Sequence, residues 1–197
     1  MTAAAGRMED AIGFAGYVAN RLNSNHGGTA RVSINIGGDP QAIAIAQRWD
    51  TLGDYGAMRE SMQGDSELKS AIRLASELFT GAADSIGQII KPAGEPGPFA
   101  LLNTANMEMP RVADAIPFAL EVAEFVEDFT GRGAGVVTSV TGDRSQLMWY
   151  GFNDSLEDIA TAGQKLEMNE EYIGFFSRSA DLFVSGSLMQ SIWQHVA

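Results

Sequence analysis

Two histidines, His26 and His195, are the side chains whose ordinary pKa of about 6.5 makes them candidate acid–base catalysts at neutral pH. His195 lies near the end of the sequence, where apolar and polar residues alternate as they do in a strand. If this strand borders a cavity, His195 can act as a general base, although the same alternation also allows it to face solvent. His26 lies in a polar stretch, residues 23–28, which predicts a solvated loop.

Polar and aromatic side chains on predicted strands indicate a binding site for a small molecule. Residues 31–36 alternate strictly, so the apolar positions suit a face covered by helices, and Ser33 and Asn35 face the other way. We predict that Arg48 handles a proton or an anionic group of the substrate. The further candidates for substrate binding are Gln88, Trp49, Trp149 and Tyr150.

Nothing in the sequence predicts a metal ion or a cofactor. The chain has no cysteine, which excludes a thiolate nucleophile and a sulfur-ligated metal. The two histidines are not at the spacing of a paired metal ligand. Gly37, Gly38 and Asp39 precede a strand-like segment rather than a helix, so they indicate a hairpin turn and not a phosphate-binding loop.

An internal repeat positions these residues. Residues 7–15 align with residues 111–119, a displacement of 104 positions, and six of the nine pairs are identical. The same displacement aligns residues 38–39 with 142–143, 50–54 with 154–158, and 77–79 with 181–183. Because one displacement holds over four segments, we predict that residues 111–197 duplicate residues 7–93.

Each copy is predicted to fold in the order β-α-β-β-α-β. Apolar residues at helical spacing predict helices at residues 8–23 and 111–129. A β-hairpin and a second helical region follow in each copy. Closing strands are predicted at residues 84–90 and 189–196, and the opening strand of the second copy at residues 99–109. This order is that of a ferredoxin-like α+β unit, in which two helices cover one face of an antiparallel sheet.

We therefore predict two ferredoxin-like repeats, at residues 1–94 and 95–197, with a Pro- and Gly-rich connector at residues 91–98. Their helix-free sheet faces are expected to pack together as a pseudo-dimeric α/β barrel. Only residues 1–5 remain of the first repeat's opening strand. Residues 99–109 fill its place, or a second protomer of a homo-oligomer does, or the natural start lies upstream.

The two copies differ most on the second strand of the hairpin. The alanines at positions 42, 44 and 46 align with Gln146, Met148 and Tyr150. Small side chains opposite bulky ones are explained by complementary packing or by a pocket in the first copy.

Composition limits the partners. The net charge of −12 repels phosphate backbones, and the basic residues form no run, so we expect no nucleic-acid partner. No apolar stretch reaches the roughly 18–20 residues of a membrane helix, and the first residues lack the pattern of a secretory signal. We expect a soluble, cytoplasmic protein without a membrane partner.

The pattern as a whole resembles the dimeric α/β-barrel superfamily, which includes antibiotic-biosynthesis-monooxygenase-like and NIPSNAP-like proteins. The resemblance rests on residues 109–119, 142–143, 154–156 and 182–187. It implies a barrel of two sheets that binds small hydrophobic molecules, with activities that range from cofactor-free oxygenation to isomerisation and haem chemistry. The haem-binding relatives need a histidine on a helix, and neither histidine is predicted on one.

The resemblance thus implies a small-molecule-binding protein, either a cofactor-independent monooxygenase or an isomerase acting on a hydrophobic aromatic substrate. His195 and Arg48 would be the catalytic residues. The alternative is a non-enzymatic structural or assembly protein whose barrel is filled by its own side chains.

Overall fold

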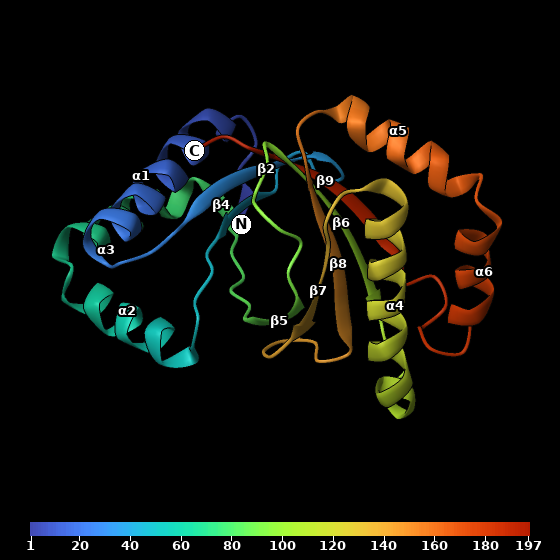
Figure 1. Ribbon diagram of the computed structural model, residues 1–197. Coiled ribbons are helices and arrows are strands. Elements are labelled where there is room, and N and C mark those ends of the chain that lie inside the picture. Colours follow the sequence, from blue (N-terminus) through green and yellow to red (C-terminus); the bar gives the residue numbers. More distant parts are fainter. The chain divides into compact units, whose positions relative to one another are not determined.

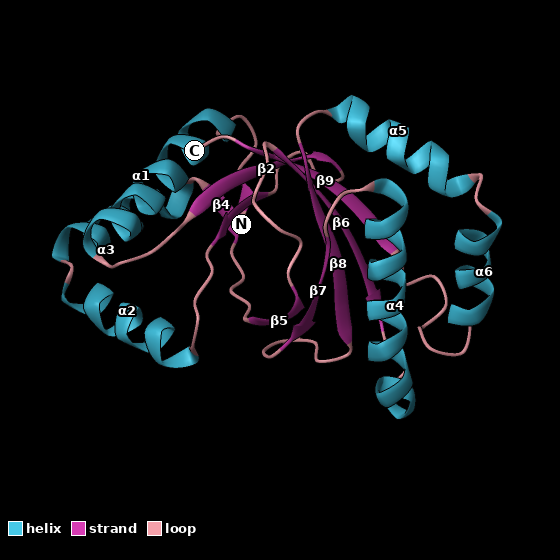
Figure 2. Ribbon diagram, viewed as in Figure 1, coloured by secondary structure: helices cyan, strands magenta, loops and turns pink.

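The computed structural model describes residues 1–197, which divide into two compact units. Unit 1 comprises Met1–Ala83 and Gln194–Ala197, and unit 2 comprises Asp84–Trp193. In each unit helices pack on antiparallel strands (Figure 1; Figure 2), so the chain belongs to the α+β class. None of the helices combines the length and the hydropathy that crossing a membrane requires.

Unit 1 is built around one β-hairpin. Its elements are β1 (Thr2–Ala3), α1 (Met8–Asn25), β2 (Arg31–Gly37), β3 (Ile43–Ala46), α2 (Leu52–Gly64), α3 (Ser66–Leu74), a 3-10 turn η1 (Ala75–Glu77) and β4 (Phe79–Gly81). β2 and β3 pair antiparallel, and β1 pairs with β4. The final residues of the chain also join this unit, because the Val32 amide donates to the Ala197 carbonyl and the Val196 amide to the Val32 carbonyl.

Unit 2 contains a larger sheet. Its elements are β5 (Gly87–Lys91), β6 (Phe99–Asn106), a 3-10 turn η2 (Met109–Arg111), α4 (Val112–Thr130), β7 (Ala134–Ser139), β8 (Gln146–Asn153), α5 (Leu156–Glu167), α6 (Glu170–Ser179) and β9 (Met189–His195), whose last two residues lie in unit 1. The strand order is β9-β6-β8-β7-β5. β5, which the sequence placed in the first repeat, therefore pairs with β7 of unit 2.

The core of unit 1 follows from the helical spacing of small and apolar residues in α1. Ala11, Ala15 and Leu22 are buried and pack on the sheet side chains Val32 and Ile43. The alanines let the helix approach the sheet closely, and full burial of a side chain such as Ile43 contributes roughly 1.5–3 kcal/mol. The same arrangement recurs in unit 2, where Ala115, Ala119 and Ala123 of α4 belong to the buried core.

Backbone hydrogen bonds of the two units recur 104 residues apart. The Ala3 amide donates to Gln41, and the Met107 amide donates to Ser145. Met1–Ala3 thus lies beside β3 in the same way as the end of β6 lies beside β8. Phe99–Asn106 does not fill that place, because it pairs along its whole length with β8. β3 is short, because Ala42 before it bridges Thr2 and the pairing with β2 ends at Ala46.

Replacing Gly133 by Ala is expected to destabilise the protein by about 1–3 kcal/mol. A Cβ atom at Gly133 would overlap the Ala93 carbonyl group, whose carbon atom would be 2.8 Å away, and backbone cannot move aside as a flexible side chain can. Gly163 is the matched control, because a Cβ there meets nothing within 4 Å and the residue lies inside α5. Gly163→Ala should leave stability unchanged or raise it, and equal urea midpoints for the two variants would contradict the prediction.

Candidate functional site

The hairpin of unit 1 has one face without helices. Val32 pairs with Ile45, and Ile34 with Ile43, and these side chains pack on the α1 side. Since successive strand residues point to opposite faces, the intervening pairs lie on the other side. Those pairs are Ser33 with Ala44 and Arg31 with Ala46. We call the surface formed by Arg31, Ser33, Ala44 and Ala46 the helix-free face.

His195 joins the helix-free face from the end of β9. Its Nδ1 atom and the Ser33 Oγ atom share a hydrogen bond of 2.7 Å. Ser33 is buried and His195 is partly buried. Burial lowers the pKa of His195 below its ordinary value of 6.5, the positive charge of Arg31 lowers it further, and hydrogen bonding to the Val32 backbone opposes the change. The imidazole is therefore neutral at pH 7.

A neutral imidazole held by a hydroxyl group beside a guanidinium group has a defined chemical capacity. The Ser33 hydroxyl fixes the orientation of the ring through Nδ1. Nε2, the other ring nitrogen, is buried, so it can remove a proton from a weak acid only if ligand binding uncovers it. Arg31 can stabilise the anion that remains, because a guanidinium group carries a positive charge. Arg31 was not singled out in the sequence, although its odd position in the alternation places it with Ser33.

The other candidates from the first half of the chain serve different purposes. Asn35 is buried, and its Oδ1 accepts a hydrogen bond from the Gly37 amide, so its side chain closes the hairpin turn. Arg48 is exposed beyond the end of β3, and its carbonyl accepts a hydrogen bond of 3.5 Å from Thr29 Oγ1. Trp49 packs against the core of unit 1.

The remaining candidates lie in unit 2. Gln88 is exposed on β5, opposite Thr138 of β7. The Trp149 indole Nε1 donates to the Ala119 carbonyl of α4 at 2.9 Å, which places this ring in the core rather than on the helix-free side. Tyr150 lies over Gly135, where a Cβ atom would be 2.5 Å from its Cζ. Of the residues predicted from the sequence, the structure brings Ser33 and His195 together.

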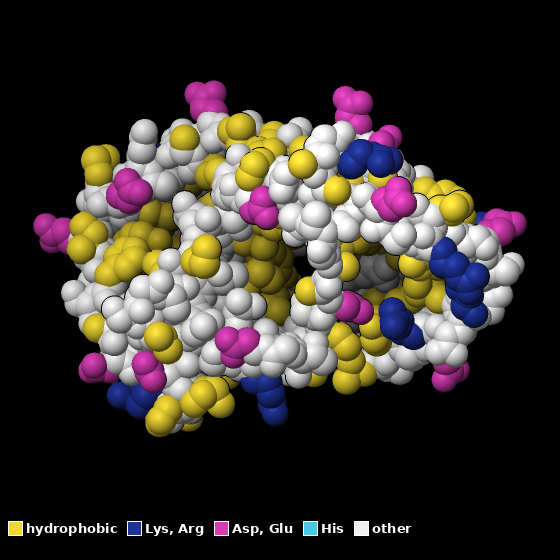
Figure 3. All heavy atoms as spheres, turned by 180° about the vertical axis from the view of Figure 1, so that it is seen from behind, with side chains coloured by type: hydrophobic (Ala, Val, Ile, Leu, Met, Phe, Trp, Pro, Cys, Tyr) yellow, Lys and Arg dark blue, Asp and Glu magenta, His cyan; other side chains and the backbone are white.

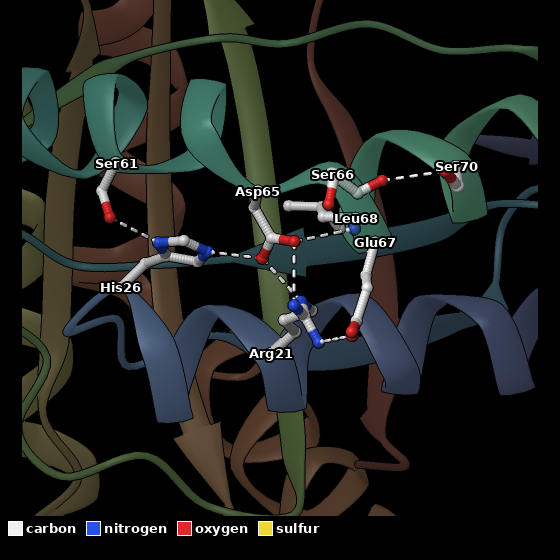
Figure 4. A network of polar contacts seen from close by, with 8 residues as sticks. All are labelled: Arg21, His26, Ser61, Asp65, Ser66, Glu67, Leu68 and Ser70. Carbon is white, nitrogen blue, oxygen red and sulfur yellow. Dashed lines mark hydrogen bonds and ion pairs between the residues drawn. The ribbon is translucent and has the colours of Figure 1, made fainter.

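His26 is not in a solvated loop, which corrects the expectation from its polar neighbours. Its side chain is 5% exposed and lies just after α1, between Ser61 of α2 and Asp65 (Figure 4). The Nδ1 atom is 2.7 Å from Ser61 Oγ, and Nε2 is 3.0 Å from Asp65 Oδ2. A serine, histidine and aspartate in a row is also the arrangement of a hydrolase triad, so its other contacts decide its role.

The contacts of Asp65 show that this cluster joins helices. Arg21 of α1 donates from Nε and Nη2 to the two Asp65 oxygens, at 2.5 and 2.8 Å. The same carboxylate accepts from the Leu68 amide and thereby caps α3. The Arg21 guanidinium is the main reason that the pKa of Asp65 lies well below its ordinary value. A carboxylate with these partners stabilises the packing of α1 on the α2–α3 junction, and no sequence spacing could have paired residues so far apart.

Neither a cluster of metal-ligating side chains nor a continuous acidic patch distinguishes the surface described below. No group of three or more histidine, cysteine, aspartate or glutamate side chains is placed to hold a metal ion. Acidic side chains stand singly on the face drawn in Figure 3, with hydrophobic side chains between them, and no histidine is visible there. The acidic side chains of this face therefore form no continuous patch (Figure 3).

Comparisons with known proteins show the fold. No protein family model and no curated protein matches the chain. A candidate monooxygenase from Fusobacterium nucleatum subsp. nucleatum is similar in structure, with a TM-score of 0.68 and 8% identity over 100% of this chain and 89% of that one. An anthrone oxidase-like protein gives a TM-score of 0.66 and 14% identity, over 100% of this chain and 88% of the other.

A third similar structure is a candidate monooxygenase from Lactobacillus acidophilus. Its TM-score is 0.62 and its identity 11%, over 99% of this chain and 90% of that one. At such low identity the similarity shows a monooxygenase-like fold and nothing about the reaction.

Proposed function

We propose that the chain is a cofactor-independent oxygenase that acts on a planar, hydrophobic aromatic substrate bound at the helix-free face of unit 1. The observation that carries the proposal is the 2.7 Å hydrogen bond between Ser33 and His195, an imidazole whose pKa is lowered. The similar structures include candidate monooxygenases and an anthrone oxidase-like protein, which suggests an anthrone-type ketone as the substrate class.

An anthrone carries a CH2 group acidic enough for an imidazole to deprotonate, because the negative charge spreads over the fused rings. His195 takes this proton, and the carbanion transfers one electron to O2. The resulting carbon radical and superoxide combine to form a C–O bond. The imidazolium returns the proton to give a hydroperoxide. His195 then removes the second proton from the same carbon, which breaks the O–O bond and forms the C=O group. The hydroxide that leaves takes the proton from the imidazolium and is released as water. One CH2 and one O2 thus become one C=O and one H2O.

The neighbouring residues suit this sequence of steps. Arg31 stabilises the carbanion and the peroxide anion electrostatically. Ser33 holds the imidazole, and Ala44 and Ala46 leave the sheet surface low enough for a flat ring to lie on it. Because the substrate anion itself reduces O2, the reaction needs no bound cofactor. Arg48, predicted as catalytic, has no role in this proposal. The same holds for five of the predicted binding residues: Asn35, Gln88, Trp49, Trp149 and Tyr150.

We further infer that the chain arose from two copies, with the boundaries at residues 1–94 and 95–197. The recurrence of hydrogen bonds at a displacement of 104 residues supports this duplication. If the chain is divided in this way, each copy's closing segment pairs within the other unit. β5 of the first copy pairs in unit 2, and residues 194–197 of the second copy pair in unit 1. The ferredoxin-like nature of each copy and the pseudo-dimeric barrel remain predictions.

The direct test is aerobic oxidation of anthrone by the purified protein. Oxygen uptake and anthraquinone formation should proceed in a one-to-one ratio, faster than in a buffer control, because anthrone also oxidises slowly by itself. A rate equal to that control would contradict the proposed reaction.

Replacing Ala44 by Met is expected to lower kcat/KM for anthrone by about tenfold, roughly the effect of a misfitting side chain in an apolar site. Met148 occupies the corresponding position of unit 2, so a sheet of this kind tolerates the side chain. The matched control is Met58→Leu, a buried change in α2 away from the helix-free face. Equal losses in both variants would show a general effect on packing instead of a filled binding surface.

The alternative, a non-enzymatic protein filled by its own side chains, is favoured by one observation in unit 2. There the Tyr150 hydroxyl accepts a hydrogen bond from the Ala93 amide at 3.4 Å, and the Tyr150 and Phe152 rings are 5.7 Å apart. These rings lie on the side of the unit 2 sheet that corresponds to the helix-free face of unit 1, where the side chains are small. If anthrone is neither oxidised nor bound, this structural role becomes the better description of both units.

A further inference from the structure

A groove of about 420 Å³ lies between α1 and the α3–η1 segment of unit 1, on the outer side of the helices. Phe14 and Tyr17 of α1 form one wall, and Ala71 and Leu74 of α3 form the other. Leu74 is 84% exposed and Tyr17 is 41% exposed. Large exposed apolar side chains beside a groove are typical of an interaction surface or a ligand-binding site.

The corresponding position in unit 2 is occupied by the protein's own side chains. The Phe175 ring of α6 stands edge-on against Phe118 of α4, with 5.8 Å between their centroids. The Arg178 guanidinium lies over both rings, 5.4 Å from Phe118 and 5.3 Å from Phe175. Two hydrogen bonds of 2.7 and 2.6 Å anchor Arg178 to Glu121. An aromatic ring and an ion pair therefore close this position in unit 2.

Unit 1 has a phenylalanine that corresponds to Phe118, but it lacks the side chains that cover this ring in unit 2. At a displacement of 104 residues, Phe14 corresponds to Phe118, and each ring has an aromatic neighbour on the next strand or bridge: Phe79 at 5.8 Å and Phe183 at 6.1 Å. The covering residues are all replaced: Ala71 stands for Phe175, Leu74 for Arg178 and Tyr17 for Glu121.

We propose that this groove is a binding site for a small neutral molecule with one aromatic ring, which packs on Phe14 as Phe175 packs on Phe118. The volume lies within the 300–1,000 Å³ that is usual for ligand sites. The site is separate from the helix-free face and does not depend on the proposed oxygenase activity.

The charges around the groove explain why the ligand is neutral. Arg7 and Asp10 line the groove and neutralise each other through an ion pair of 2.8 Å. The same pair recurs between Arg111 and Asp114 in unit 2, so it serves α1 and α4 alike and is not a ligand-specific feature. A net charge of −12 repels an anion, and no unpaired carboxylate lines the groove to attract a cation.

The test uses fluorine NMR with 4-fluorobenzyl alcohol as the probe. With the unaltered protein, the probe signal should broaden severalfold through exchange with the slowly tumbling complex. Ala71→Phe introduces the ring that unit 2 carries, so the linewidth should return to that of the free probe. Ile72→Phe adds the same ring to the next residue, which is 49% exposed and does not line the groove, and should leave the broadening unchanged.

Two further variants make the result decisive. Tyr17→Glu combined with Leu74→Arg copies the ion pair of unit 2 and should also abolish the broadening, which covers the case that Ala71→Phe does not fold. His195→Gln should bind the probe like the unaltered protein. Loss of broadening in His195→Gln would place the probe on the helix-free face and overturn the groove site. Absence of broadening in the unaltered protein, or its persistence in both filled variants, would overturn it as well.

Discussion

Replacing His195 by Gln is expected to lower kcat/KM for aerobic anthrone oxidation by about 10²–10⁴-fold, the usual contribution of a general base. Glutamine is close to histidine in size and can still hydrogen-bond to Ser33, but it cannot take a proton at neutral pH. Steady-state oxygen uptake measures the rate, and circular dichroism checks that the fold is intact. Retention of the full rate would remove His195 from the mechanism.

The pH dependence gives a second measure of the same residue. Because burial and Arg31 lower the pKa of His195, the base stays neutral from pH 7 down to below its ordinary value of 6.5. The acid limb of kcat/KM should therefore lie below pH 6.5. Stability follows the same sign: the folded state binds fewer protons than the unfolded chain, so this contribution is complete above pH 6.5 and decreases as the pH falls.

The chain offers a matched control in its other histidine. His26→Gln removes an imidazole that contacts Ser61 and Asp65 and has no place in the proposed reaction. The variant should lower the thermal midpoint and leave kcat/KM unchanged. An equal loss of rate in both variants would point to general destabilisation.

Replacing Asp65 by Ala is expected to have the largest effect on stability, with a thermal midpoint lower by more than about 5 °C. The substitution leaves the partly buried Arg21 without its bidentate partner, takes a partner from His26 and removes the cap of α3. Asp65→Asn should cost less, because asparagine also caps helices, as Asn169 does for α6. Thermal unfolding followed by circular dichroism gives the order of the three proteins.

The effect of Asp65 should also depend on pH. Its pKa is lowered in the folded state, so it contributes stability that is present above the ordinary value of 3.8 and is lost as the pH falls. The difference in urea midpoint between the unaltered protein and Asp65→Asn should therefore be largest near pH 7 and shrink below pH 3.8. A difference that stays constant down to pH 3 would exclude the ion pair as its source.

A surface ion pair in unit 2 is the control for this experiment. Arg178 and Glu121 are paired at 2.6 Å, yet their side chains are 54% and 50% exposed. Because solvent screens exposed pairs, Glu121→Gln should change the midpoint little. Because both pairs join helices, a shift as large as that of Asp65→Asn would mean that burial of the pair does not explain the effect of Asp65.

Much of the local structure could be predicted because it depends on neighbours in the chain. Apolar spacing placed α1 and α4 within a few residues of their observed bounds, and the second helical region of each copy begins at a capping residue, Thr51 for α2 and Ser155 for α5. Alternation assigned Ser33 to the face opposite α1. Helix periodicity, capping and strand alternation are properties of adjacent residues, so a single sequence contains them.

The candidate site could be predicted only in part. His195 was a sound candidate by its chemistry, but its partner Ser33 is 162 positions away in the chain. Arg48 and Trp149 were reasonable candidates by residue type. Arg48 lies beyond the end of β3, and the Trp149 ring is hydrogen-bonded to Ala119 of α4, so neither lies on the helix-free face. His26 was misjudged because its polar neighbours indicate a loop, whereas the contacts that bury it come from α2 and Asp65.

The sequence by itself therefore determined the long helices, the hairpin strands and the faces on which their side chains lie, since these are set by local geometry, and it predicted a repeat at a displacement of 104 residues. Only the tertiary structure decided which distant residues meet: Ser33 with His195, Asp65 with Arg21, and β5 with β7. Such contacts depend on how whole elements pack, and packing responds to the volume and burial of many side chains together.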